Sequence, residues 1–417
     1  MRLSYKHTRL AGYIGYITQA ISINLAPLFF IIFQDRYAIT YSRLGQLVLV
    51  TFVIQLSVDF LSIRLLEKIG YRAAAIAAHV LAAVGLILLG ILPPLFVDPY
   101  LGILVAVFFY SMGGGMTEVV ISPLIDAIPG DAKAASMSLL HSFYSWGQCL
   151  VVLVTTVLLR FVGDDLWGLL PCLWALIPLS DLILFCFVPI PPMVTEKQTG
   201  NRLSDLLRKP LFYLFILLMI CGGAAEMTMS QWASLFAEKA LGVSKVTGDI
   251  LGPCFFGVLM GLGRVGYGLW GQKYRIAPAL FGCSVLTLIC YLLSVFGSLP
   301  VFSLIGCGFC GLGVSLMWPG VLSLSSGKYP RAGAPMFAVL ALAGDLGCSL
   351  GPWLSGVVTD FAKAPGALHM AGIAGDAEQI AMKHGMLIAA VFPLIMTAVL
   401  GVYLWWEKKR TKITYSK

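Results

Sequence analysis

Apolar residues in this chain fall into twelve stretches, each close to twenty residues long and separated by short polar segments. A helix needs about 20 apolar residues to cross the roughly 30 Å hydrocarbon core of a bilayer, and its backbone hydrogen bonds must be satisfied within it. The pattern therefore predicts an all-α membrane protein of twelve transmembrane helices. We expect them near residues 10–33, 45–66, 73–93, 99–126, 134–161, 166–188, 211–237, 249–271, 277–297, 300–326, 333–361 and 384–406.

The second half of the chain repeats features of the first half, in the same order. Gly45 is answered by Gly248, and the glycine-rich run at 113–115 is answered by 311–313. Repeats of this kind are found in transporters whose halves are related by pseudo-two-fold symmetry. The longest polar break divides the apolar stretches six and six. We therefore expect an N-terminal six-helix bundle at 1–190, a cytoplasmic linker at 191–210 and a C-terminal six-helix bundle at 211–417.

The charge of the chain fixes its orientation. The net charge is +8, but most Lys and Arg residues fall on the loops and helix ends that share a side with the N-terminus. The positive-inside rule then predicts that both termini are cytoplasmic, in the inner membrane of a cell. Basic residues with this placement do not indicate a nucleic-acid partner. They include Arg2, Lys6, Arg9, Arg64, Lys68, Arg72, Arg202, Arg208, Lys209, Lys273, Arg275, Lys328, Arg331, Lys408, Lys409 and Arg410.

Composition argues against an enzyme. Hydrophobic residues make up 59% of the 417 residues and charged residues 12%, which leaves no room for a soluble catalytic domain. Nearly all of the ten cysteines lie inside apolar stretches, where they act as small packing residues. Cys307 and Cys310 have C-x-x-C spacing, but no His or second Cys pair accompanies them. We expect no metal and no other cofactor.

The turn after the second predicted helix carries a recognisable motif at residues 63–72. It resembles the pattern G-x-L-x-D-R-x-G-R-[KR]: Glu67 and Lys68 supply the acidic and the basic residue, whereas Ile63 replaces the first glycine and Tyr71 a basic residue. With this motif, the chain resembles the major facilitator superfamily over essentially its whole length. The resemblance implies a latch between the two halves on the cytoplasmic side; the alternative is that these charges simply mark a cytoplasmic loop. The predicted gate residues are Glu67, Lys68, Gly70, Arg72, Asp59 and Arg264.

Within that superfamily the chain is most similar to the fucose:proton symporters and their glucose and mannose relatives. Three runs carry this similarity, at residues 113–123, 139–147 and 223–232. The first resembles G-x-G-x-x-E-x-x-x-N, with Glu118 as its acid and Ser122 in place of the usual Asn. That departure leaves the identity of the sugar open. The resemblance implies that Glu118 is a coupling acid.

Glu118 also stands out without any resemblance, because it lies in the middle of an apolar helix. Placing a charged side chain at the bilayer centre costs about 2.5–3.5 kcal/mol on insertion scales. Burial favours the neutral form of a carboxylic acid, so such a group can load and release a proton. Asp345 and Glu226 are the next candidates for this role. The alternative is a protonated Glu that serves packing alone. Arg264 is expected to form a structural charge pair, with Asp345 or with Asp59.

A polar stripe lies on the predicted fifth helix. His141, Tyr144 and Gln148 are spaced i, i+3 and i+7, which places them on one face. Their donors, acceptors and ring suit a polyhydroxylated solute, although a purely structural network is the alternative. The full set of predicted substrate-binding residues is Gln19, Asn24, Glu118, His141, Tyr144, Gln148, Glu226, Gln231, Trp232 and Trp318.

These observations predict a secondary active transporter that imports a small neutral polar solute, a sugar or sugar-like molecule, by proton-coupled alternating access. Helix centres carry almost no Lys or Arg, which disfavours phosphorylated or polycarboxylate substrates. The lipid bilayer and protons are the other expected partners, and the family resemblance implies a monomer. The rivals on the same fold are a proton-coupled exporter of hydrophobic cations and a carrier of a non-sugar solute. A membrane hydrolase would need a nucleophile with a base, or a metal motif, and the sequence has neither.

Overall fold

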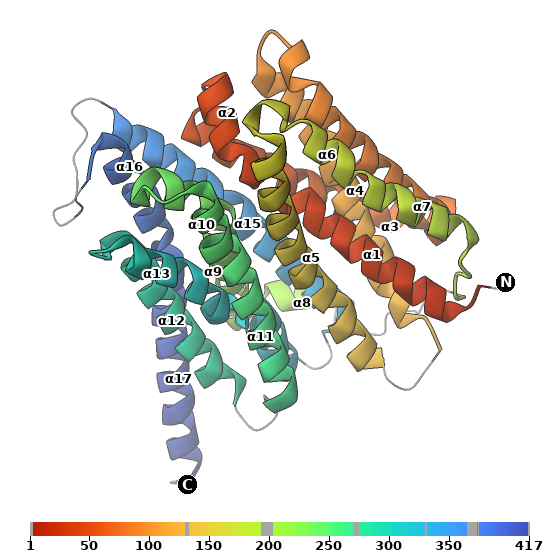
Figure 1. Cartoon of the computed structure of the whole chain (residues 1–417). Helices are drawn as coiled ribbons and strands as arrows, with labels where there is room; N and C mark the ends of the chain where they lie inside the picture. The colour runs from red at the N-terminus through yellow and green to blue at the C-terminus, as the bar shows by residue number, and fades with distance from the viewer. Residues whose placement is uncertain are drawn as a thin grey trace. The chain divides into compact units, whose positions relative to one another are not determined.

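The protein is all-helical in the part of the chain that its structure, a computed structural model, describes: residues 3–129, 133–192, 203–270, 275–329, 332–364, 373 and 375–415. Twelve segments within this part are long and apolar enough to cross a membrane, as the sequence predicted (Figure 1). The chain divides into two compact units, Met1–Glu196 and Lys197–Lys417. A short helix, α8 (Leu203–Leu207), lies within the segment predicted as the linker.

The N-terminal unit begins with a membrane span in three pieces. The first helix stops at Asn24, and the chain passes through a 3₁₀ turn that contains Pro27 before it becomes helical again. Proline has no N–H to donate to the preceding turn, so the break follows from the sequence. The elements of this unit are α1 (Tyr5–Asn24), η1 (Ala26–Phe29), α2 (Phe30–Tyr37), α3 (Tyr41–Ile91), η2 (Pro93–Leu95), α4 (Pro99–Asp126), α5 (Lys133–Val162), η3 (Asp164–Leu166), α6 (Leu169–Trp174) and α7 (Leu176–Phe187).

Helix α3 contains two membrane spans, Tyr41–Leu61 and Lys68–Ile91, joined without a loop. The helix is kinked near the start of the second of these spans, at Gly70, whose backbone has φ 77° and ψ 163°. Only glycine adopts this region readily, because any Cβ there is strained. The glycine of the sequence motif is therefore the hinge between the second and third spans.

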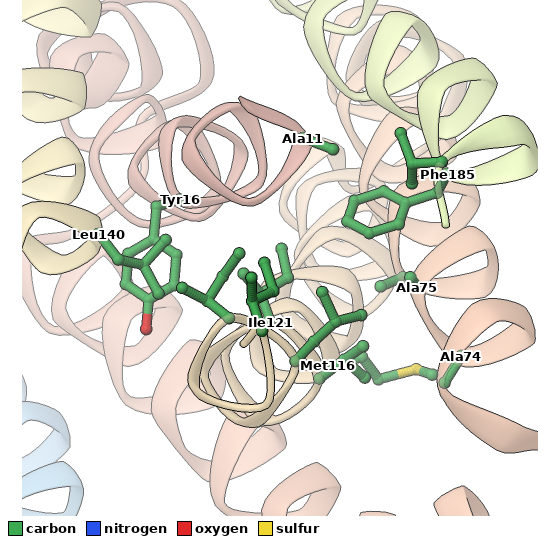
Figure 2. Close-up of a cluster of buried hydrophobic side chains, with 14 of the residues drawn as sticks. Ala11, Tyr16, Ala74, Ala75, Met116, Ile121, Leu140 and Phe185 are labelled. Carbon is green, nitrogen blue, oxygen red and sulfur yellow. The ribbon is translucent and has the colours of Figure 1, made fainter. Parts of the chain in front are cut away.

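A core cluster of the N-terminal unit is formed by α1, α3, α4, α5 and α7, with α4 packed against α1 and α3 (Figure 2). Alanines on α3 make this close approach possible: a Cβ added to Gly113 of α4 would lie 2.7 Å from the carbonyl oxygen of Ala78. Small residues allow membrane helices to pack backbone against backbone. The buried members are Ala11, Tyr16, Val58, Ala74, Ala75, Ala78, Met116, Val120, Ile121, Leu124, Ile125, Ile128, Leu140, Phe185 and Val188.

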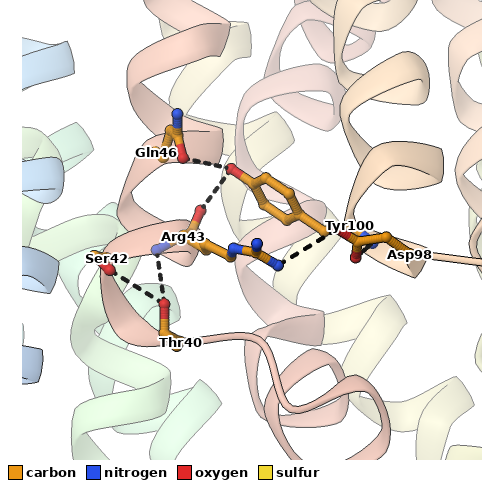
Figure 3. A network of polar contacts seen from close by, with 6 residues as sticks. All are labelled: Thr40, Ser42, Arg43, Gln46, Asp98 and Tyr100. Carbon is orange, nitrogen blue, oxygen red and sulfur yellow. Dashed lines mark hydrogen bonds and ion pairs between the residues drawn. The ribbon is translucent and has the colours of Figure 1, made fainter.

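A polar network joins the start of α3 to the start of α4 (Figure 3). The Arg43 guanidinium lies 3.6 Å from Asp98 and over the ring of Tyr100, whose centroid is 5.0 Å away. The Tyr100 hydroxyl donates to Gln46 Oε1 at 3.0 Å. Arg43 and Asp98 are both largely exposed, so this contact fixes the geometry of the helix ends more than it stabilises them.

The C-terminal unit is organised around α9, which is buried along most of its length and packs against α15. Its next span is irregular, since a π-helical segment that contains Pro253 separates α10 from α11. The elements of this unit are α8 (Leu203–Leu207), α9 (Pro210–Leu241), α10 (Lys245–Asp249), η4 (Ile250–Cys254), α11 (Phe255–Trp270), α12 (Ile276–Phe296), α13 (Pro300–Val314), α14 (Met317–Lys328), α15 (Gly333–Lys363), α16 (Ala377–Ala389) and α17 (Val391–Tyr415).

A buried acid, which the sequence analysis did not single out, precedes this π-helical segment. Asp249 is fully buried and accepts hydrogen bonds from Lys245 Nζ at 2.9 Å and from the Ser234 hydroxyl of α9. The Lys245 side chain is only 19% exposed. The pair and the serine satisfy each other inside the unit, and they tie α10 to α9.

Replacing Gly70 by alanine should destabilise the protein by about 1–3 kcal/mol, because alanine is strained at this φ and ψ. No atom lies within 4 Å of the position of the added methyl, so the cost is conformational and not steric. The measurement is thermal unfolding of the purified protein in detergent. The control is Gly282→Ala in the middle of α12, which also meets open space but has helical geometry, and which should be neutral or stabilising. Equal melting temperatures for the two variants would contradict this account of the hinge.

Candidate functional site

The strongest candidate site in the N-terminal unit is a cluster of polar side chains from α1, α3, α4 and α5. At its centre, Gln19 Nε2 of α1 donates to Glu118 Oε2 of α4 at 2.5 Å. Gln19 is buried, whereas Glu118 is exposed on the unit. Glu118, which the sequence analysis expected to cost free energy inside the membrane, thus has an uncharged hydrogen-bond partner. It also has a face that is open to other molecules.

Helical periodicity explains why these two helices meet through polar groups. Tyr16 lies three residues before Gln19, and Ser122 lies four residues after Glu118, so each pair shares one helix face. The Tyr16 and Ser122 hydroxyls are 2.5 Å apart. The second contact locks α1 against α4 one turn away from the Gln19–Glu118 bond. Tyr16 is a buried core residue, and it contributes this hydrogen bond as well.

The stripe on α5 joins the same cluster. The ring of His141 meets the ring of Tyr16 edge to face, with 5.2 Å between centroids. The Tyr144 hydroxyl accepts from Asn24 Nδ2 at 3.4 Å, and Gln148 is buried on the same helix. The structure therefore brings together the residues that the sequence selected on the first, fourth and fifth helices.

Gln55 of α3 is a member that the sequence analysis missed. A Cβ on Gly114 would lie 3.3 Å from Gln55 Nε2, which places this amide against the glycine run of α4. Gln55 Nε2 and Gln19 Oε1 are buried, and neither has a hydrogen-bond partner in the part of the chain that the structure describes. The signal in the sequence was a lone amide in an apolar helix opposite three glycines. The cluster thus has one free donor and one free acceptor.

Asp59, one turn further along α3, is half-buried and was predicted as a gate residue. It interacts electrostatically with Glu118. Two carboxyl groups that repel each other resist carrying charge at the same time, so the protonation of each depends on the other. This connects Asp59 to the Glu118 cluster, in addition to any part it has in a gate.

The candidate acid of the C-terminal unit has a different environment. Glu226 Oε1 of α9 lies 3.3 Å from Arg264 Nη2 of α11, with side chains 10% and 28% exposed. Its second oxygen, Oε2, is buried and without a hydrogen-bond partner among the described residues. Arg264 Nε also donates to the carbonyl of Ser315 at 3.4 Å, where the chain breaks between α13 and α14. The sequence predicted a charge pair for Arg264 with Asp345 or Asp59; the structure gives it Glu226.

The other predicted residues of this unit are mostly packed. Trp232 is 0% exposed, and its indole N–H donates to the carbonyl of Pro352 in α15 at 3.2 Å. Trp232 therefore packs between two helices in this structure, and its contact with substrate stays a prediction. Gln231 is also buried, with Nε2 3.5 Å from Met227 Sδ.

Trp318 packs against α15 beside the position of Asp345. Its ring covers Gly344 of α15, so that a Cβ at Gly344 would overlap the ring. Gly344 is thus a close-approach position, and the half-buried Asp345 follows it directly.

A separate crevice of about 570 Å³ runs between α11, α12 and α13. It is lined almost entirely by apolar side chains and glycines, together with Ser315. The part of the chain that the structure describes contains no group of His, Cys, Asp and Glu able to hold a metal ion.

The motif residues at the predicted gate have a clear role inside the N-terminal unit. Arg72 donates to the carbonyls of Phe185, Cys186 and Val188 at 2.7–2.8 Å, at the C-terminal end of α7. Those carbonyls have no partner within their own helix, and a cation is favourable at that end of the helix dipole. Lys68 is exposed, and the side chain of Glu67 lies outside the described residues. The latch between the halves stays a prediction.

Comparison with known proteins agrees with this architecture. The family model described as Major Facilitator Superfamily matches residues 12–352. No curated protein matches the chain in sequence. A mutant of the nucleoside transporter NupG has a similar structure, with a TM-score of 0.75 at 12% identity over 95% of this chain and 98% of that one.

Two other solved structures are similar. A bacterial homologue of the human lysosomal transporter Spinster, inward-facing and occupied, gives a TM-score of 0.74 at 14% identity over 95% of this chain and 96% of that one. A variant of the E. coli fucose:proton symporter FucP gives 0.60 at 18% identity over 93% and 98%. Identities this low establish the fold and not the transported solute.

The Glu226–Arg264 pair can be tested by double-mutant analysis. Arg264→Gln leaves a buried carboxylate without its cation and should cost about 3 kcal/mol of stability, measured by thermal or denaturant unfolding. Adding Glu226→Gln should recover part of this loss. The control is Arg275→Gln, because Arg275 is 73% exposed in its pair with Glu407 and should cost less than about 1 kcal/mol. If the buried and exposed arginines prove equally dispensable, the pair does not stabilise the unit.

Proposed function

The chain belongs to the major facilitator superfamily, and from this premise we propose that it imports a small neutral polar solute, a sugar or sugar-like molecule, together with protons. The observation that carries the proposal is the Gln19–Glu118 bond at the centre of a polar cluster on membrane-spanning helices. The chain is a multi-pass membrane transporter and not an enzyme. The cell inner membrane, the cytoplasmic termini and the monomeric state are parts of the proposal.

The chemistry of the cluster supports a neutral solute rich in hydroxyl groups. Its members are amides, hydroxyls, an imidazole and carboxyl groups, and it includes no Lys or Arg to bind a phosphate or carboxylate. A sugar hydroxyl both donates and accepts, so after a change of side-chain conformation that exposes them it could accept from Gln55 Nε2 and donate to Gln19 Oε1, two buried atoms without hydrogen-bond partners among the described residues. The rings of His141 and Tyr144, which are not fully buried, offer apolar faces for C–H groups.

The same bond supports proton coupling. When Glu118 is ionised, it accepts from the Gln19 N–H group; when it is protonated, it becomes a donor and suits the amide oxygen instead. Protonation would therefore change which atom of Gln19 is left for the solute. An exposed carboxyl group with a neutral partner can exchange its proton more readily than one paired with arginine, such as Glu226.

The names of the similar solved structures bear on the class of solute. One similar protein is a fucose:proton symporter and another a nucleoside transporter, and both names denote solutes that contain a sugar. The similar Spinster homologue keeps other solutes open. Alternating access follows from the family resemblance and stays a prediction.

The coupling role of Glu118 can be tested in proteoliposomes with an imposed pH gradient. Glu118→Gln should abolish gradient-driven accumulation while solute exchange without a gradient continues, because the amide keeps the shape but carries no exchangeable charge. The control is Asp126→Asn, two turns further along the same helix and exposed, which should accumulate solute like the wild type. Full accumulation by Glu118→Gln would rule out this carboxyl as the proton carrier.

The class of solute can be tested with the same vesicles. Uptake is measured for labelled sugars, polyols, nucleosides, amino acids and organic cations. We expect uptake of polyhydroxylated solutes and no uptake of the others. For a transported solute, Gln55→Leu should raise KM about tenfold, since it removes one hydrogen bond worth roughly 1.4 kcal/mol. Gln46→Leu on the same helix removes the acceptor of Tyr100 and should leave KM unchanged. Movement of organic cations alone would favour the exporter instead.

A further inference from the structure

The N-terminal unit holds a second pair of titratable side chains that the proposed transport site does not use. His79 lies in the second span of α3 and Asp181 in α7, and His79 Nε2 is 2.8 Å from Asp181 Oδ2. Both side chains are 0% exposed. Ionisable groups buried inside membrane spans are expensive and call for an explanation.

An aromatic ring of α7 and a glycine of α1 lie directly against the pair. The ring of Phe185, one turn after Asp181, lies 5.2 Å from the imidazole, and Phe185 is labelled beside Ala75 in Figure 2. Helix α1 covers the pair with Gly15, where an added Cβ would lie 3.5 Å from Asp181 Oδ2. Among the described residues of α1, α3, α4 and α7, the titratable group that interacts electrostatically with Asp181 is His79. The electrostatic interactions of Glu118 are with Tyr16 and Asp59.

The hydrogen-bond geometry determines the protonation of the imidazole. His79 Nδ1 lies 2.7 Å from the carbonyl oxygen of Ala75. A carbonyl oxygen can only accept, so Nδ1 must carry a hydrogen. In a neutral imidazole the other nitrogen, Nε2, would then present a bare lone pair toward Asp181.

A bare nitrogen and an ionised carboxylate facing each other at 2.8 Å in a fully buried contact are strongly unfavourable. The two lone pairs repel, and an uncompensated buried charge is costly. One proton must therefore lie on either Nε2 or the carboxyl group. In both forms, imidazolium with carboxylate or imidazole with carboxylic acid, the pair holds the same single proton and is neutral overall.

We propose that His79 and Asp181 form a second proton-binding site, which keeps one proton bound between α3 and α7 and is separate from Glu118. With the proton in place, the pair joins the two helices; loss of the proton leaves a net negative charge and opposed lone pairs at a buried contact. The contact is therefore favourable at low pH and weakens as pH rises. This inference concerns the stability and protonation of the N-terminal unit and does not depend on the transported solute.

The first test is the pH dependence of thermal unfolding of the full chain in lipid nanodiscs. Wild type should lose melting temperature toward alkaline pH. Asp181→Asn can donate an amide N–H to Nε2 without any added proton, so this loss should become smaller. His79→Phe isolates the acid and should melt lower than wild type at neutral pH, with partial recovery at acid pH. His79→Phe combined with Asp181→Leu should remove that pH dependence.

The second test observes the proton directly, which a purely structural contact would not change. In ¹⁵N-histidine-labelled protein at neutral pH, either the His79 signals show both ring nitrogens protonated, or a protonated-carboxyl infrared band is present and disappears in Asp181→Asn. Recording both in a Glu118→Gln background removes the other acid and should leave the signals unchanged. His384 is the control imidazole, because its Nδ1 makes the same 2.7 Å contact to a carbonyl four residues earlier.

The outcomes separate cleanly. A neutral His79 ring together with an ionised Asp181 at neutral pH would overturn the proposal, as would an Asp181→Asn variant whose melting temperature follows pH like the wild type. Loss of transport in Glu118→Gln with intact His79 signals would support the separation of the two proton sites. Loss of the His79 signals in Glu118→Gln would show that the sites are one and would overturn the proposal.

Discussion

A polar side chain inside a bilayer must find its partner within the protein, and this constraint governs the arrangement of the whole molecule. Water is absent at that depth, so an unpaired donor, acceptor or charge costs far more than it would at a soluble surface. Each membrane-embedded acid with a contact described above meets a different kind of partner: an amide for Glu118, an arginine for Glu226, an imidazole for Asp181 and a lysine for Asp249. Those partners give the four acids different chemistry.

Glu118 and Glu226 illustrate how the partner affects the chemistry of a buried acid. Arginine stays charged under all ordinary conditions, so Arg264 favours the ionised form of Glu226, which burial opposes. A glutamine amide can serve either protonation state, because it presents both a donor and an acceptor. Glu118 thus has a neutral partner that suits both protonation states, whereas Glu226 has a cationic partner that favours one of them. The two units share a fold without sharing this chemistry.

Small residues are the second requirement, because polar partners meet only if their helices approach closely. Gly114 allows Gln55 to lie against α4, and Gly344 makes room for the ring of Trp318. Arg72 meets the same requirement at a helix end. Its guanidinium donates to the carbonyls of Phe185 and Cys186, at the end of α7, and of Val188, the residue that follows the helix. In each case, packing density and hydrogen bonding are satisfied together, which is why glycine and alanine occur beside the polar groups.

The sequence by itself determined the twelve spans and the candidate residues on α1, α4 and α5, because apolar length and helical spacing act locally along the chain, and the motif at residues 63–72 indicated the superfamily by resemblance. It could not decide partners. Arg264 with Glu226, Trp232 with Pro352 and His79 with Asp181 join residues 38, 120 and about 100 positions apart, and periodicity along one helix carries no information about which neighbour it meets. Only the tertiary structure distinguishes an acid paired with an amide from one paired with a cation, because that distinction lies in the contacts between helices.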